Sequence, residues 1–227
     1  MKFLLDCANL EAVAFFNEFY PIAGVTTNPS ILKKNQGIDF FPQLIKIQRI
    51  LAGRDLHVQT TAKESDQIIQ EAHCLVNKLG KDIYVKVPVF EEGMKAIKTL
   101  KKEGIRITAT AVYTKFQAYM ALELGADTIA PYFNRMENLG ISSIDVITDL
   151  RYIIDRDGYE SQILGASFKN TYQVSDALKA GAHQVTLSED VMKETFLNPS
   201  IEKAISDFAD DWVDFAGGTE SICELKG

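Results

Sequence analysis

Lys86 is the residue whose type and setting point most directly to chemistry. It stands in the apolar run YVKVPV, between Val85 and Val87. An ammonium group buried in a strand is costly unless it is paired, and burial shifts a lysine toward its neutral amine. A neutral amine attacks carbonyl carbons and forms a Schiff base. We therefore interpret Lys86 as a nucleophile toward a ketone; the alternative is a lysine that extends to solvent from the end of its strand.

Other polar side chains stand at the ends of similar short runs. Gln59, Thr110 and Tyr132 are neutral groups that together can hold one water molecule, and a tyrosine hydroxyl can donate or accept the proton that passes through it. Polar residues are also common where strands meet solvent, and Tyr132 alone would suit a core aromatic with its hydroxyl bonded to the backbone. The polar run ends are Asp6, Thr27, Asn28, Gln59, Lys86, Thr110, Tyr132 and Ser167.

Arg135, Ser167 and Lys169 form a second group, suited to a phosphate. Ser167 and Lys169 belong to ASFKN, after the seventh run, and Arg135 lies three residues beyond Tyr132. In a barrel of parallel strands the loops near the seventh strand often hold phosphate, and an arginine binds it through two parallel hydrogen bonds. Ordinary surface charge is the alternative for each residue taken alone.

The histidines and cysteines do not follow a metal-binding pattern. The three histidines form no HxxxH or HxH pair, and the three cysteines form no CxxC pair. We expect no metal and no cofactor, pyridoxal phosphate included, and reduced thiols in a cytoplasmic protein. These residues are His57, His73, His183, Cys7, Cys74 and Cys223.

Eight short runs rich in Val, Ile and Thr predict buried parallel strands. Amphipathic stretches lie between several of them, and four of these stretches lead into a glycine, a common helix terminator. The expected strands are Phe3–Asp6, Gly24–Thr27, Leu56–Thr60, Ile83–Val87, Ile105–Thr110, Thr128–Tyr132, Gln162–Ser167 and Gln184–Leu187. The expected helices between them are Glu11–Tyr20, Ala62–Gly80, Glu91–Glu103, Thr114–Leu124 and Tyr172–Ala180.

This alternation predicts an α/β fold with a parallel sheet. Eight strands in about 190 residues favour a closed (β/α)8 TIM barrel. An open doubly wound sheet is the alternative, weakened by the lack of a GxGxxG motif after the first strand. The apolar stripe over Pro199–Phe215 predicts an extra C-terminal helix, packed on its own barrel or on a neighbouring subunit. We expect one domain over residues 1–227.

The composition excludes several classes of protein. The chain has 227 residues, 46% of them hydrophobic, which is enough for a sizeable core and rules out global disorder. The net charge of −7 argues against nucleic-acid binding. No apolar run approaches the roughly 20 residues of a membrane span. The start, MKFLLDCANLE, does not resemble a signal peptide.

The sequence resembles the transaldolase family of class I aldolases, and within it the small bacterial branch of fructose-6-phosphate aldolases and transaldolase-like proteins. The resemblance extends from residue 1 through the helix that contains Trp212. GVTTNPS together with VKVP is the most specific part. The motifs are FLLDCAN at Phe3–Asn9, AGVTTNPSIL at Ala23–Leu32, VKVPV at Val85–Val89, GIRITATAVYTKFQA at Gly104–Ala118, APYFNR at Ala130–Arg135 and LGASFKN at Leu164–Asn170.

The resemblance implies a role for each matched residue. Lys86 would be the Schiff-base lysine, and Asp6 would take the C4 hydroxyl proton during carbon–carbon cleavage. Asn28, with Thr27 beside it, would contact the bound sugar. The phosphate would be bound by Arg135, Ser167 and Lys169; family members commonly have arginine at the last of these positions.

The resemblance also separates two activities. Transaldolases typically carry glutamate and phenylalanine where this chain has Gln59 and Tyr132, and many carry asparagine where it has Thr108. The pair found here is that of fructose-6-phosphate aldolases, so we expect cleavage of fructose 6-phosphate to dihydroxyacetone and glyceraldehyde 3-phosphate. A transaldolase of the pentose phosphate pathway is the alternative, and a non-catalytic sugar-phosphate binder is a remote one.

The resemblance also implies a homo-oligomer, a decamer of two pentameric rings. Cys223 and the tail after Trp212 have no assigned role.

Overall fold

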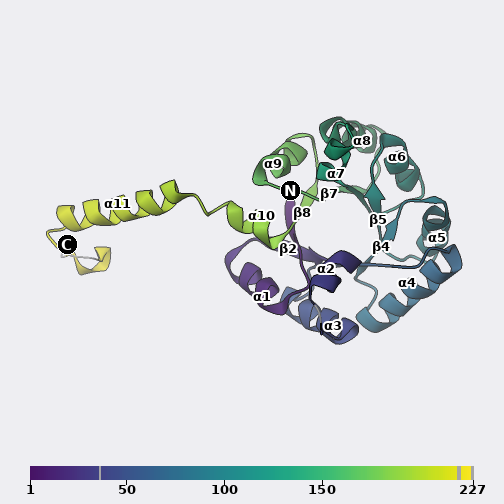
Figure 1. The fold of residues 1–227 in the computed structure, drawn as a ribbon, viewed down its shortest axis with the longest axis horizontal. Helices are drawn as coiled ribbons and strands as arrows, with labels where there is room; N and C mark the ends of the chain where they lie inside the picture. Colours follow the sequence, from purple (N-terminus) through teal and green to yellow (C-terminus); the bar gives the residue numbers. More distant parts are fainter. Residues whose placement is uncertain (36, 219–220, 226–227) are drawn as a thin grey trace. The chain divides into compact units, whose positions relative to one another are not determined.

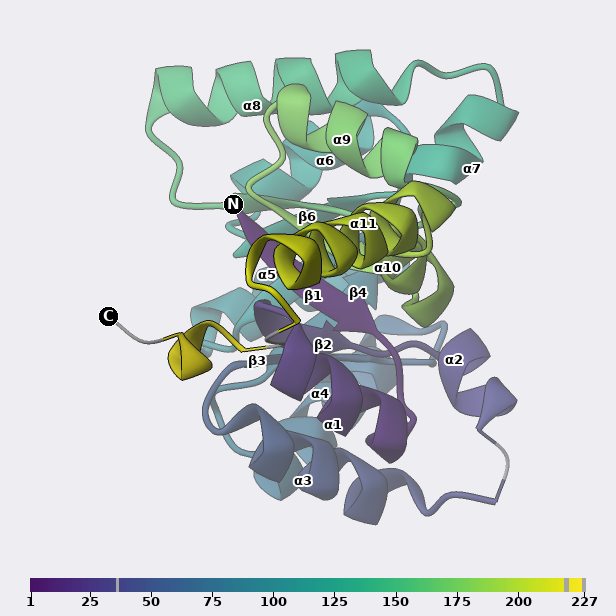
Figure 2. The same cartoon turned by 90° about the vertical axis from the view of Figure 1, so that its left-hand side faces the viewer.

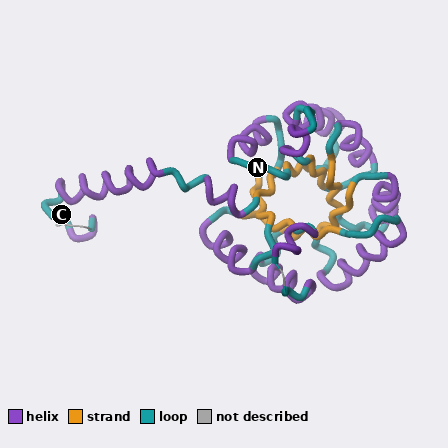
Figure 3. The backbone as a smooth tube through the Cα atoms, in the orientation of Figure 1, coloured by secondary structure: helices purple, strands orange, loops and turns teal. Residues whose placement is uncertain are grey.

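The computed structural model describes residues 1–35, 37–218 and 221–225. Eight parallel strands close into a barrel in chain order, and helices surround them (Figures 1 and 3). The (β/α)8 barrel predicted from the sequence is therefore confirmed, and the open sheet is excluded. The strands are β1 (Lys2–Asp6), β2 (Ile22–Thr26), β3 (Asp55–Gln59), β4 (Tyr84–Pro88), β5 (Ile107–Val112), β6 (Thr128–Pro131), β7 (Gln162–Gly165) and β8 (Gln184–Leu187).

The helices cover the barrel on every side. In the side view of Figure 2, α8 and α9 lie on one side of the strands, and α1 and α3 lie on the opposite side. The helices of the barrel are α1 (Leu10–Phe19), α2 (Pro29–Lys34), α3 (Phe40–Leu51), α4 (Ser65–Leu79), α5 (Glu91–Lys102), α6 (Lys115–Glu123), α7 (Phe133–Asn138), α8 (Ser143–Asp157) and α9 (Thr171–Lys179). They are followed by α10 (Glu189–Glu194), α11 (Pro199–Phe215) and a short 3-10 turn, Ile222–Glu224.

Most element boundaries agree with the sequence within two residues, and β5 shows why some shift. This strand begins at Ile107 because the Ile105 amide donates to the Leu100 carbonyl at 3.1 Å, which assigns Ile105 to the turn after α5. Gly80 ends α4, as expected. Its φ of +93° is a backbone conformation that residues other than glycine rarely adopt. Five of the observed helices are not predicted from the sequence: α2, α3, α7, α8 and α10.

The interior of the barrel mixes an apolar cluster with polar groups. Leu4, Ala130 and Leu164 form a buried cluster. Strand residues alternate between the interior and the helix layer, so the polar side chains at every second position enter the barrel. This alternation is what brings side chains from eight separate strands to one axis.

His57 is one of these buried polar groups. Its Nδ1 lies 2.8 Å from the Thr108 hydroxyl, and its ring stacks on Tyr84 with centroids 4.2 Å apart. Burial first, and then the positive charges of Lys86 and Arg106, hold the pKa of His57 well below its ordinary value of 6.5. The imidazole is therefore neutral in the folded protein.

A neutral buried histidine makes the fold sensitive to acid. The unfolded chain binds a proton at His57 near pH 6.5 and the folded chain does not, so the free energy of unfolding should fall as the pH drops below that value. The slope from one such group is at most about 1.4 kcal/mol per pH unit. Urea unfolding of His57→Phe between pH 5 and 8 should lack this slope, whereas the half-buried control His73→Phe should retain it. Parallel profiles for His57→Phe and the parent chain would contradict the prediction.

The chain divides into two compact units, Met1–Val191 and Met192–Gly227. The first holds the barrel. In the second, α11 confirms the predicted C-terminal helix, and none of its side chains is buried. Its apolar stripe is open to solvent: Ile205 is 64%, Phe208 71% and Phe215 80% exposed.

Within the residues described, no helix is both long and apolar enough to cross a membrane. The single domain over residues 1–227 stays a prediction.

Candidate active site

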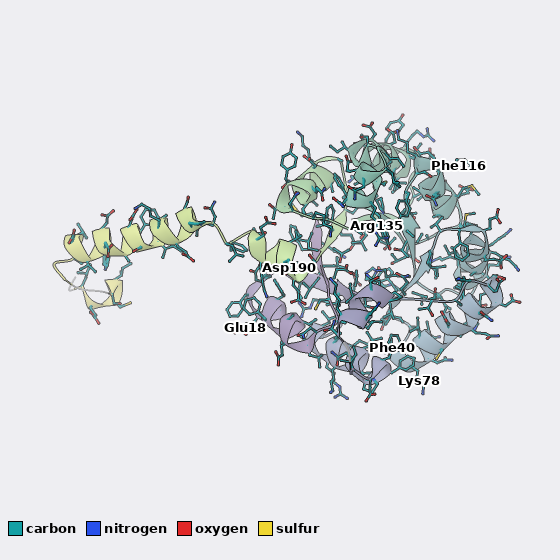
Figure 4. The ribbon with its side chains drawn as sticks, viewed as in Figure 1. Glu18, Phe40, Lys78, Phe116, Arg135 and Asp190 are labelled. Carbon is teal, nitrogen blue, oxygen red and sulfur yellow. The ribbon has the colours of Figure 1, made fainter. Side chains whose placement is uncertain are left out.

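A cavity of about 300 Å³ opens where the strands end at the C-terminal side of the barrel. Figure 4 shows Arg135 over the barrel mouth, whereas Lys78 and Phe116 lie on the outer side of the helix ring. Each of the eight strands contributes lining residues, either from the strand itself or from the segment that follows it. They are Asp6, Asn28, Pro29, Ser30, Gln59, Lys86, Ala111, Tyr132, Arg135, Ala166, Ser167 and Thr186.

Lys86 lies in the wall of this cavity, in the middle of β4. It is only 5% exposed, and its Nζ donates to the Thr27 carbonyl at 2.9 Å. Burial lowers the pKa of Lys86, and the nearby Asp6 carboxylate acts in the opposite direction. The neutral amine, which is the nucleophilic form, is therefore more accessible than in an ordinary lysine.

Asp6 ends β1 and lines the same cavity. Its Oδ1 accepts a hydrogen bond from the Thr26 hydroxyl at 2.5 Å. Burial raises the pKa of Asp6, while Lys86, the Thr26 hydrogen bond and Lys34 act to lower it. The cavity thus holds a carboxyl group with a raised pKa and an amine with a lowered pKa. Both pKa values are shifted toward neutral pH, a pattern found where proton transfer is catalysed.

Tyr132 and Thr110 form a hydrogen-bonded pair beside these two groups. Their hydroxyl oxygens are 2.9 Å apart. Burial raises the pKa of Tyr132, so the phenol keeps its proton and is able to donate it. Gln59 lines the cavity too, and its buried Oε1 has no hydrogen-bond partner among the described protein atoms.

The rim of the cavity carries a cation. Arg135 Nη1 donates to the Tyr113 hydroxyl at 3.1 Å, and the guanidinium carbon lies 4.8 Å from the centre of the Tyr132 ring. The two tyrosines meet edge to face, with ring centroids 5.6 Å apart. Arg135 is therefore held over the mouth and still exposed to solvent, which suits an anionic group of a substrate.

Two residues of the cavity wall have unusual backbone conformations. Ala111 has φ +56° and Ser167 has φ +65°, the left-handed region that favours glycine. Ala111 lies where the pairing of β5 with β6 shifts, between Ala109 and Val112. Such conformations cost on the order of 1–3 kcal/mol each and gather at functional sites.

Three of the residues expected at the site do not line the cavity. Thr110 is connected to the cavity by the hydrogen bond between its hydroxyl and that of Tyr132. The Thr27 hydroxyl donates to the His57 carbonyl at 3.3 Å, and it is the Thr27 carbonyl that meets Lys86. Lys169 is exposed, and its backbone amide donates to Gln173. Asn28 does line the cavity, where its Oδ1 also caps α2 by accepting from the Ile31 amide at 3.1 Å.

Five residues that line the cavity are not among the site residues predicted from the sequence, and one of them lies on the eighth strand: Pro29, Ser30, Ala111, Ala166 and Thr186. Thr186 is inside β8, at a position that alternates inward with Gln184. That alternation was the available signal. Among residues 1–35, 37–218 and 221–225, no three His, Cys, Asp or Glu side chains gather where they could hold one metal ion.

The fold and the cavity define a class of protein: a (β/α)8 barrel whose site, at the C-terminal mouth, contains a buried lysine and a carboxylate. A family model described as transaldolase/fructose-6-phosphate aldolase matches residues 3–216, and the chain belongs to this family of enzymes of carbohydrate metabolism.

Relatives of both kinds are similar to the chain. A probable fructose-6-phosphate aldolase from Streptococcus pneumoniae is 48% identical over 213 residues, which cover 93% of this chain and 96% of the relative. A probable transaldolase from Lactiplantibacillus plantarum is 34% identical over 215 residues, covering 95% of this chain and 98% of the relative. A probable transaldolase from Streptococcus pyogenes serotype M5 is also 34% identical over 215 residues, covering 95% and 99%.

Proposed function

We propose that the chain is a Schiff-base (class I) aldolase that cleaves fructose 6-phosphate to dihydroxyacetone and glyceraldehyde 3-phosphate and catalyses the reverse addition. The observation that carries this proposal is the buried Lys86 amine, which lines one cavity together with the Asp6 carboxylate. The family supports a sugar-phosphate substrate. The 48% identity to a probable fructose-6-phosphate aldolase supports the particular reaction.

The reaction begins with an imine. The neutral amine of Lys86 attacks the C2 carbonyl carbon of the sugar, and the resulting carbinolamine loses water to give a protonated imine. A water molecule held by Gln59, Thr110 and Tyr132 carries the protons for this dehydration. The lowered pKa of Lys86 favours the attack, because only the unprotonated nitrogen has a free electron pair.

Carbon–carbon cleavage follows. Asp6 accepts the proton of the C4 hydroxyl, C4 becomes the aldehyde carbon of glyceraldehyde 3-phosphate, and the C3–C4 electron pair moves into the imine to form an enamine. The protonated imine serves as the electron sink. Asp6 suits this role because it is partly exposed to the cavity and has a raised pKa, which makes it a better base than an ordinary carboxylate.

The enamine is then protonated at C3 and hydrolysed, which releases dihydroxyacetone and restores Lys86. Tyr132 supplies the proton through the same water, since its hydroxyl is bonded to Thr110 and keeps its proton. A glutamine at position 59 orients this water and does not ionise. Hydrolysis without a second sugar is what makes the chain an aldolase.

A transaldolase is the second candidate, and the relatives that are named probable transaldolases favour it. It would use the same Lys86 and pass the enamine to an aldose acceptor. The discriminating experiment measures glyceraldehyde 3-phosphate release from fructose 6-phosphate, first without and then with erythrose 4-phosphate. Release without the acceptor is the expected result. Release only with the acceptor would contradict the proposal and support the transaldolase.

Arg135→Ala should weaken binding of the phosphorylated aldehyde. Loss of a charge-assisted hydrogen bond costs about 1.5–3 kcal/mol, so the KM for glyceraldehyde 3-phosphate in the synthetic direction should rise roughly 10- to 100-fold. The KM for unphosphorylated glyceraldehyde should change little. Arg156→Ala, which alters an exposed arginine paired with Asp157, serves as the control. An equal change for both aldehydes would contradict a phosphate role for Arg135.

We further propose that the protein is a homo-oligomer in the cytoplasm, a decamer of two pentameric rings. The exposed apolar side chains of α11, among them Phe208 and Phe215, support association, because such surfaces gain free energy when another chain covers them. The three cysteines are all unpaired, which is consistent with a reducing compartment.

A further inference from the structure

Two buried hydroxyl groups lead to the Asp6 carboxylate. The Thr26 hydroxyl lies 2.5 Å from Asp6 Oδ1 and 2.7 Å from the Thr186 hydroxyl. Thr26 is fully buried and Thr186 is 4% exposed. They belong to β2 and β8, the two strands that pair with β1, so the carboxylate is approached from both neighbouring strands.

The direction of the hydrogen bonds follows from the number of protons. An ionised carboxylate only accepts, so Thr26 donates its single hydroxyl proton to Asp6. Thr26 then has no proton left for Thr186, and the Thr186 hydroxyl must donate to the Thr26 oxygen. Hydrogen bonds in such a chain polarise one another, which strengthens the bond to the carboxylate.

We propose that Thr26 and Thr186 are positioning residues that orient Asp6 and hold it ionised until it takes the proton of the substrate hydroxyl. The proposal rests on the base role of Asp6 in the proposed function. With Oδ1 bonded to Thr26, the second carboxylate oxygen is the one left for the substrate. Thr186 does not contact Asp6 through this chain but contributes to its orientation, because the hydrogen bond from Thr186 fixes the direction in which the Thr26 hydroxyl proton points.

The charged and titratable groups around Asp6 set the background for this effect. Lys86 and Lys34 favour its ionised form. Cys7 and Tyr132 also interact electrostatically with it. None of these groups is changed by a substitution at Thr26 or Thr186, so a change in the titration of Asp6 reports on the two hydroxyls.

Thr128 offers a matched control. It is 1% exposed and lies in β6 of the same barrel, and its hydroxyl has no hydrogen-bond partner among the described protein atoms. Thr128→Val therefore removes a buried hydroxyl in the same way without altering the contacts of Asp6. Thr186→Ser keeps the hydroxyl and removes only a methyl group.

The kinetic test compares Thr186→Val and Thr26→Val with Thr128→Val. Both should lower kcat for cleavage, Thr186→Val about 10-fold and Thr26→Val by more, since a lost hydrogen bond to a charged group is a larger loss. The acid limb of the pH profile should move to higher pH, because the carboxylate has lost its donors. Thr186→Ser should restore both. Trapping of dihydroxyacetone on the protein by borohydride should be unchanged, because imine formation does not require Asp6.

A second measurement keeps the inference testable whatever the substrate is. Carbon-13 NMR should give a higher pKa for the Asp6 carboxyl in Thr186→Val than in Thr128→Val. Equal Asp6 titrations in these two variants would overturn the proposal, as would Thr186→Val with the kcat of Thr128→Val in a protein that cleaves the sugar. Failure of the parent protein to cleave fructose 6-phosphate or to be trapped would contradict the proposed function alone.

Discussion

Lys86→Ala is expected to abolish cleavage of fructose 6-phosphate. The substitution removes the proposed nucleophile of a covalent mechanism, so kcat should fall on the order of 10⁴-fold or more. Among the described residues that line the cavity, Lys86 is the one lysine. The measurement is the rate of glyceraldehyde 3-phosphate release by purified variant and parent protein.

Controls separate lost chemistry from lost structure. Lys86→Met keeps the approximate length of the side chain and removes the amine of a buried residue, so the variant should be inactive and at least as resistant to thermal unfolding as the parent. Lys81→Ala changes an exposed lysine in the turn before β4 and should retain full activity. Near-normal turnover by Lys86→Ala would contradict the Schiff-base mechanism.

Tyr132→Phe is expected to separate imine formation from cleavage. The variant loses the hydroxyl that is hydrogen-bonded to Thr110 and that supplies the proton in the proposed mechanism. Removal of a positioned proton-transfer group typically costs about 10²- to 10⁴-fold, and we expect kcat for cleavage to fall within this range. Lys86 is unchanged, so the imine with dihydroxyacetone should still be trapped by borohydride.

The control for this variant is Tyr172→Phe, which removes the hydroxyl of an exposed tyrosine on α9 and should leave kcat unchanged. Thermal unfolding of Tyr132→Phe should resemble that of the parent, since the ring and its contacts with Tyr113 and Arg135 remain. A variant that cleaves poorly and also fails to be trapped would show that the Tyr132 hydroxyl is essential for imine formation, and that Gln59 and Thr110 alone do not hold the water that serves this step.

The barrel and much of its site could be predicted from sequence because both depend on local patterns. A lysine between valines, as at Lys86, marks a buried amine without any knowledge of its neighbours in space. Closure of the barrel then brings Asp6, Tyr132 and Arg135 to the same mouth, since every parallel strand of a barrel ends on the same side.

The contacts between strands could not be predicted in this way. The bond between Thr26 and Thr186 joins residues 160 positions apart, and it depends on β1 being flanked by β2 and β8. The Arg135–Tyr113 bond likewise depends on side-chain directions at the barrel rim. The left-handed conformation of Ala111 has no sequence signal, because alanine does not favour it.

Strand alternation explains the difference between Thr26 and Thr27. Successive strand residues point to opposite sides, so a shift of one residue in the expected end of β2 exchanges the side chain that enters the barrel. Thr26 reaches Asp6, while Thr27 contributes its carbonyl to Lys86. Thr27 is the residue predicted at the site from the sequence, whereas the side chain that contacts Asp6 is that of Thr26.

The most direct test of the central claim is to locate the covalent adduct. The parent protein is incubated with fructose 6-phosphate, reduced with borohydride, digested and examined by peptide mass spectrometry. We expect a single reduced adduct, on the peptide that contains Lys86, and none in the Lys86→Met variant. An adduct on a different lysine, or active turnover with no adduct at all, would contradict the assignment of Lys86 as the Schiff-base nucleophile.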